Sequence, residues 1–119
     1  MNSDSPDHDA TRPVRLVFSI VGDKWTPVVL YLLAQGPKRF GELQRETAGI
    51  SKKMLTQVLR TLERRSLVDR QVFAEVPPHT EYSLTEKGRL FHEPISALCE
   101  WAQENMELLE SILEIDAED

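Results

Sequence analysis

The 119-residue sequence is short of several features, and each shortage excludes a class of protein. It has a single cysteine, Cys99, which excludes an internal disulfide framework and fits a reducing compartment. No apolar run approaches the length of a membrane span, and the first residues lack the basic, apolar and small-residue zones of a signal peptide. We therefore expect one cytoplasmic domain with no membrane partner and a core of modest size.

Groups of residues with catalytic or metal-binding spacing are also lacking. The sequence has no glycine-rich phosphate loop and no Ser-centred elbow. His92, Glu93 and Cys99 could approach a metal ion at a dimer interface, but their spacing matches no established ligand motif. The sequence therefore predicts no catalytic residue, no metal site and no cofactor.

Positive charge is scarce overall, but it is concentrated in one segment. The formal net charge is −6, yet residues 38–70 hold nine basic and four acidic residues, a net charge of +5. The remainder of the chain carries −11, and after Arg89 nine acidic residues follow without one basic residue. A positive segment on an acidic body attracts a polyanion in one orientation, because phosphate repels the acidic end.

Residues 40–65 have the pattern of two helices joined by a tight turn. Residues 40–46 form a short amphipathic segment, Ala48-Gly49 interrupts it, and Ser51 can cap a second helix. In that helix Leu55, Val58, Leu59 and Leu62 form an apolar stripe, and the opposite face carries Lys52, Lys53, Thr56, Gln57, Arg60 and Arg64. Such side chains can read base edges in a major groove, although a plain helical hairpin with a solvated basic face has the same pattern.

The segments before this pair supply the start of the expected domain, which spans residues 13–119 and follows a disordered acidic tail at residues 1–12. Residues 14–21 are mainly apolar and predict a helix that ends at Gly22. Asp23 or Thr26 can cap the next helix, and Pro27 suits its first turn. This second helix is apolar nearly all round, so we expect it at the centre of the core.

After the basic helix the pattern changes to that of a β-hairpin. Residues 67–73 and 80–84 are rich in strand formers, and residues 74–79 between them form a turn stiffened by two prolines. A hairpin in this place can act as a wing that rests on the phosphate backbone or enters the minor groove. The alternative is a hairpin that only closes the core.

The last segment, from Glu86 onward, is helical in pattern, with Thr85 as its cap and Pro94 as the site of a kink or a break. Trp101, Leu108 and Ile112 widen its apolar face beyond what so small a core requires. Such a face is most simply buried against its twin in a symmetric dimer, unless the helix folds back wholly onto its own core. The fold class expected is α+β, mainly α with a small β-hairpin wing.

Several motifs follow one another along the chain: GDKWT at residues 22–26, RFGEL at 39–43, GISKKMLT at 49–56, LRTLE at 59–63, PPHTEYSLTEKG at 77–88, and Trp101. Together they resemble the HxlR family of bacterial and archaeal winged helix-turn-helix regulators. The match runs in order and without gaps from about Val14 to Trp101. The resemblance implies a transcription factor that binds a near-palindromic operator in double-stranded DNA as a homodimer, with its N- and C-terminal helices at the dimer interface.

The resemblance also implies roles for individual residues. Residues 51–65 would be the recognition helix, and Lys38 and Arg39 would begin the preceding helix and contact the DNA backbone. Gln57 suits adenine, and Arg60 suits guanine or phosphate. The residues expected to contact DNA are Lys38, Arg39, Ser51, Lys52, Lys53, Thr56, Gln57, Arg60, Arg64 and His79. Those expected at the dimer interface are Val17, Phe18, Leu98, Trp101, Leu108 and Ile112.

The sequence departs from the family pattern at two places. Members often carry Arg or Lys after the Pro-Pro pair, where this chain has His79. We expect a weaker wing contact at neutral pH that strengthens as the imidazole gains a proton. Members that sense oxidants do so through a cysteine in the first helix, which this chain lacks. Cys99 is expected to be a small buried apolar residue, and a small-molecule effector is left open.

A winged helix used for protein–protein contact is the alternative function, because this fold hosts both roles. A protein-binding version should be neutral or apolar on the exposed face of its second helix. Lys53, Arg60 and Arg64 share that face with Gln57, which favours DNA.

Overall fold

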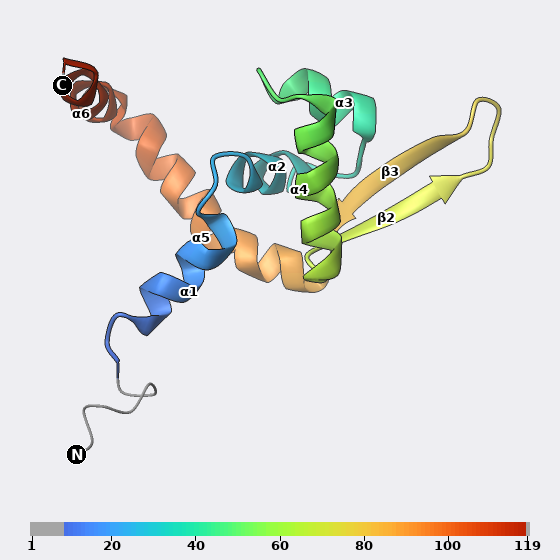
Figure 1. Ribbon diagram of the computed structural model, residues 1–119, viewed down its shortest axis with the longest axis horizontal. Helices are drawn as coiled ribbons and strands as arrows, with labels where there is room; N and C mark the ends of the chain where they lie inside the picture. Colours follow the sequence, from blue (N-terminus) through green and yellow to red (C-terminus); the bar gives the residue numbers. More distant parts are fainter. Residues whose placement is uncertain (1–8, 119) are drawn as a thin grey trace.

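The computed structural model describes residues 9–118 and contains a three-stranded sheet together with α-helices. The elements are α1 (Arg12–Val21), α2 (Thr26–Leu33), β1 (Lys38–Arg39), α3 (Phe40–Glu46), α4 (Lys52–Arg64), β2 (Val68–Phe73), β3 (His79–Leu84), α5 (Glu86–Glu104) and α6 (Met106–Glu118). The sheet is antiparallel with the strand order β1-β3-β2. The β2–β3 hairpin projects on one side of α4, while α1 and the end of α5 with α6 extend on the other (Figure 1). This is the expected α+β winged helix-turn-helix architecture.

The core lies where α2, α3 and α4 meet the sheet. Its apolar side chains are Val29, Leu30, Leu32, Leu33, Leu43, Ile50, Leu55, Val58, Leu59, Leu62, Leu67, Val68, Tyr82 and Leu84. Leu30, Leu55 and Leu62 are completely buried, which stabilises the fold by about 1.5–3 kcal/mol for each side chain. The central position expected for α2 is confirmed. The four apolar residues expected on the buried stripe of α4 are confirmed as well.

Side-chain caps fix where two helices begin. Ser51 Oγ accepts a hydrogen bond of 3.0 Å from the Met54 N–H at the start of α4, and Thr85 Oγ1 accepts one of 2.9 Å from the Gly88 N–H at the start of α5. Gly49, with φ of +87°, permits the turn between α3 and α4, because this conformation is unfavourable for residues with a side chain. Both predicted caps and the predicted turn are therefore confirmed.

Asp23 is the residue that satisfies the start of α2. Its carboxylate accepts hydrogen bonds from the N–H groups of Trp25 (2.9 Å) and Thr26 (2.7 Å) and from the Thr26 hydroxyl (2.7 Å). Burial alone would raise the pKa of Asp23, but these hydrogen bonds outweigh it and lower the pKa below the ordinary value. Of the two caps considered, the aspartate is therefore the acceptor, and Thr26 donates to it.

Two boundaries differ from those expected. Lys38 and Arg39 form strand β1 instead of the start of the next helix, because they pair with Tyr82 and Glu81 of β3. Helix α5 continues through Pro94 and changes direction along its length (Figure 1). It ends before Asn105, where no break was expected. The Asn105 side chain there donates a 2.8 Å hydrogen bond to the Trp101 carbonyl. The sequence pattern thus located the bend but missed the break.

The N-terminal boundary can be followed only in part. Residues 1–8 of the expected disordered tail lie outside the described residues. Asp9 is ordered, because its carboxylate accepts a 2.9 Å hydrogen bond from the Thr11 N–H, and α1 begins at Arg12. Among the described residues, the first helix therefore begins one residue before the expected start of the domain at residue 13, and the extent of the tail stays a prediction.

Candidate nucleic-acid interface

Helix α4 presents an exposed basic face opposite its buried stripe. Ser51, Lys52, Lys53, Gln57, Arg60 and Arg64 are all exposed, and Thr56 is half-buried. The Thr56 hydroxyl donates a 2.8 Å hydrogen bond to the Lys52 carbonyl one turn earlier, so its oxygen is free only to accept from an outside group. Six of the seven expected residues of this segment are therefore accessible to a ligand, and Thr56 is partly accessible.

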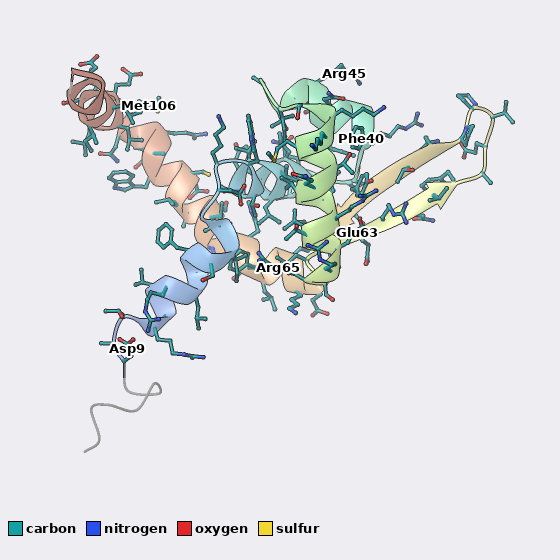
Figure 2. The ribbon with its side chains drawn as sticks, in the orientation of Figure 1. Asp9, Phe40, Arg45, Glu63, Arg65 and Met106 are labelled. Carbon is teal, nitrogen blue, oxygen red and sulfur yellow. The ribbon has the colours of Figure 1, made fainter. Side chains whose placement is uncertain are left out.

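A cleft of about 360 Å³ separates α4 from the base of the hairpin. It is lined by Thr56, Leu59, Arg60, Glu63, Arg64, Arg70 and Tyr82. Glu63 lies on the side of α4 that faces the hairpin, while Arg65 lies on the other side (Figure 2). The Arg70 Nε atom is 3.3 Å from the Glu63 carboxylate, and the Arg64 guanidinium donates a 3.2 Å hydrogen bond to the Thr61 hydroxyl.

The charged groups around this cleft affect the pKa of Tyr82. Burial raises the pKa of Tyr82, and the nearby Glu63 carboxylate raises it further, while Arg70 and Arg60 act in the opposite direction. Arg70 was missing from the residues expected to contact DNA. Its signal in the sequence was weak, because strand alternation alone cannot tell which face of β2 turns toward α4.

The residues expected before α4 are less favourably placed. Lys38 Nζ is 3.1 Å from the Glu46 carboxylate, and its side chain is only 14% exposed. Arg39 is exposed and lines a second hollow, which lies between α3 and β3 and also includes Arg45 and His79. Of the two, only Arg39 offers its charge directly to a ligand, and a backbone contact by Lys38 would require it to leave Glu46.

His79 is the first residue of β3, so the wing turn is residues 74–78. Its ring stacks on Phe73 with a centroid separation of 4.7 Å, and its Nδ1 atom is 3.7 Å from the Glu75 carboxylate. Its side chain is 15% exposed, whereas Val76 at the wing tip is almost fully exposed. The expected contact of His79 with DNA, and its strengthening at lower pH, stay predictions.

The six residues expected at the dimer interface lie on exposed apolar faces. Val17, Phe18, Leu98, Trp101, Leu108 and Ile112 are 45–65% exposed, and α1 has no buried residue. Cys99, expected to be buried, is half-buried beside them. It lines a hollow of about 300 Å³ between α2 and α5, together with Val28 and Tyr31.

A larger hollow of about 670 Å³ lies between α1, the α1–α2 turn and α4. Its lining includes Phe18, Trp25, Met54, Gln57 and Arg65.

Within residues 9–118 there is no cluster of three metal-ligating side chains. In the same part of the chain no single helix is long and apolar enough to cross a membrane, although α1 and α2 together, bent by 77°, meet the length and composition of a span.

Comparison with known proteins places these features in a family. The HxlR-like helix-turn-helix family model matches residues 20–110. An uncharacterized HTH-type transcriptional regulator of Bacillus subtilis, YybR, is 40% identical over 99 residues, which cover 83% of this chain and 79% of that protein.

Two solved structures are similar. The reduced form of the redox regulator HypR superposes with a TM-score of 0.77 at 40% identity, over 83% of this chain and 98% of that one. The putative transcriptional regulator YtfH of Salmonella typhimurium gives 0.74 at 36% identity, over 86% and 91% of the two chains. With its exposed basic helix, adjacent wing and matching relatives, this chain belongs to the HxlR-like helix-turn-helix family of DNA-binding transcriptional regulators.

Proposed function

We propose that the protein binds a near-palindromic operator as a homodimer and regulates transcription in the cytoplasm. The observation that carries this proposal is the exposed basic face of α4 beside a wing, on a molecule whose opposite side is apolar and acidic. A helix of this kind enters the major groove, and a two-fold dimer places two such helices on successive turns of DNA.

The shape of the chain supports the homodimer. Its radius of gyration is 17.4 Å, whereas a single compact domain of this length is expected at about 13–14 Å. Helix α1 and the end of α5 with α6 extend from the body on one side and the hairpin extends on the other (Figure 1), and the apolar residues of these helices are exposed. A second copy of the chain would cover these faces.

Selection of binding sites from random duplex DNA tests the DNA-binding part. We expect enrichment of a two-fold-related sequence with half-sites about one helical turn apart, and loss of enrichment in the Gln57→Ala, Arg60→Ala double variant. If folded protein enriched no sequence at low salt, the function would move to the alternative, a winged helix that contacts another protein.

Sedimentation velocity tests the dimer. We expect wild type to sediment as a dimer and Trp101→Asp to sediment as a monomer, because a charge in an apolar interface is costly to bury. Val76→Asp is the matched control, since Val76 is 99% exposed at the wing tip, away from the proposed interface. A monomeric wild type at micromolar concentration would contradict the proposal.

The hollow between α1 and α4 is our proposed place for a small-molecule effector. Its lining combines Phe18 of the proposed dimer face with Gln57 of the proposed DNA face, so a ligand there would touch both. A thermal-shift screen of wild type against Thr61→Trp, which fills the hollow, tests this. The place is wrong if every stabilising compound acts equally on the variant. Redox regulation, the role for which HypR is named, is not proposed for this chain, because its single cysteine lies on α5 and not in the first helix.

A further inference from the structure

The cleft between α4 and the hairpin has more positive charge than its own groups neutralise. Three arginines and one carboxylate line it, and the carboxylate of Glu63 is 3.3 Å from Arg70 Nε. Within the described residues neither Arg60 nor Arg64 has an ion-pair partner. The cleft therefore attracts an anion, and one carboxylate already occupies part of it.

The position of the cleft identifies that anion. In the proposed complex α4 lies in the major groove and the hairpin lies over the adjacent minor groove. A phosphate strand separates these two grooves, so it must cross the opening between α4 and the base of the hairpin. Guanidinium groups bind phosphate in a fixed fork geometry and suit this place.

We propose that Arg60, Arg64 and Arg70 bind one phosphate of the DNA backbone in this cleft, and that Glu63 is an internal competitor which the phosphate displaces from Arg70. This inference rests on the proposed DNA-binding function and adds Arg70 and Glu63 to its machinery. The Glu63 and Arg70 side chains are 29% and 52% exposed, so the ion pair can open without disturbing the core. Removing the competitor should strengthen DNA binding regardless of base sequence, because a phosphate contact carries no sequence information.

The test measures fluorescence anisotropy of a labelled random-sequence duplex between about 50 and 200 mM salt. Four proteins are compared: wild type, Glu63→Gln, Arg70→Gln and the double variant. We expect Glu63→Gln to bind about 2- to 5-fold more tightly, from the usual strength of an exposed ion pair. Arg70→Gln should bind more weakly and should reduce the slope of log affinity against log salt by about 1.

The double variant separates a local competitor from a general charge effect. If Glu63 acts by holding Arg70, Glu63→Gln should strengthen binding less in the Arg70→Gln background than in wild type. Asp69→Asn is the matched control, because Asp69 precedes Arg70 on β2 and side chains of successive strand residues point to opposite faces. It removes the same charge near the same place but outside the cleft lining.

Three results would overturn the inference. One is equal strengthening by Glu63→Gln and Asp69→Asn, and another is an unchanged affinity and salt slope for Arg70→Gln when wild type binds DNA. The third is additivity of the two cleft substitutions. If folded wild-type protein bound no duplex at low salt, the proposed function would fail, and the phosphate cleft with it.

Discussion

Gly88, in the first turn of α5, is the position where a single added methyl group should cost most. A Cβ atom there would overlap the Leu67 carbonyl oxygen, and it would also lie 3.1 Å from the Leu67 carbonyl carbon and 3.3 Å from Leu84 Cδ2. Leu67 precedes β2 and Leu84 ends β3, so Gly88 is where α5 packs on the base of the wing. Because the obstacle is backbone, no side-chain rotation can relieve it.

The magnitude follows from two opposing effects. Ala is favoured over Gly in a helix by about 1 kcal/mol, whereas forcing an extra carbon into a filled site costs about 1–3 kcal/mol and occasionally more. With backbone on one side and Leu84 on another, we expect the upper end, a net loss of roughly 2 kcal/mol. For a domain of this size, that lowers the midpoint of thermal unfolding by roughly 10 °C.

Circular dichroism during thermal unfolding measures the effect, and Gly41→Ala is the control. Gly41 is an exposed residue of α3, and a Cβ atom there meets only the end of the flexible Arg45 side chain at 3.3 Å. We expect Gly41→Ala to leave stability unchanged or to raise it by up to about 1 kcal/mol. Equal stability of the two variants would refute the close packing of α5 on the segment that enters β2.

Three further predictions concern single side chains. Ser51→Ala removes the 3.0 Å cap of α4 and should lower the free energy of unfolding by about 1 kcal/mol, measured by urea denaturation, whereas an unchanged value would contradict the cap. Because the pKa of Asp23 is lower in the folded state, its contribution should be present above its unfolded pKa and lost as pH falls through the folded value. Acid titrations of stability should therefore be flatter in Asp23→Asn than in wild type, and identical curves would speak against this role. Since Glu63 helps to raise the pKa of Tyr82, Glu63→Gln should lower that pKa in an absorbance titration of tyrosine, and no change would place the carboxylate farther away.

Local signals in the sequence were sufficient for much of the fold. Ser51, Gly49 and the stripe that begins at Leu55 determine α4 through capping, turn conformation and helical spacing, and all three depend on neighbouring residues only. Strand β1 was missed because two residues show no alternation, and Lys38 becomes extended only by pairing with Tyr82 of a distant strand. Asn105 was missed as a helix end because the apolar spacing continues across it.

The part of the candidate site on α4 could also be predicted from local signals, whereas its contacts with the hairpin and with β1 could not. The exposed face of α4 follows from its buried stripe, so Gln57 and Arg60 could be placed without a structure. Arg70 and Glu63 could not be paired from the sequence, since their separation depends on how the hairpin docks against α4. The neutralisation of Lys38 by Glu46 was hidden for the same reason, because it joins β1 to the end of α3.

In the proposed complex, a dimer presents two α4 helices to successive major grooves of one operator. Hydroxyl-radical footprinting of the protein on its selected site tests this most directly. We expect protected backbone segments related by two-fold symmetry and separated by about one helical turn, 10–11 bp, with protection weakened in the Arg60→Ala variant. A single asymmetric protected segment, or protection that is unchanged in that variant, would contradict it.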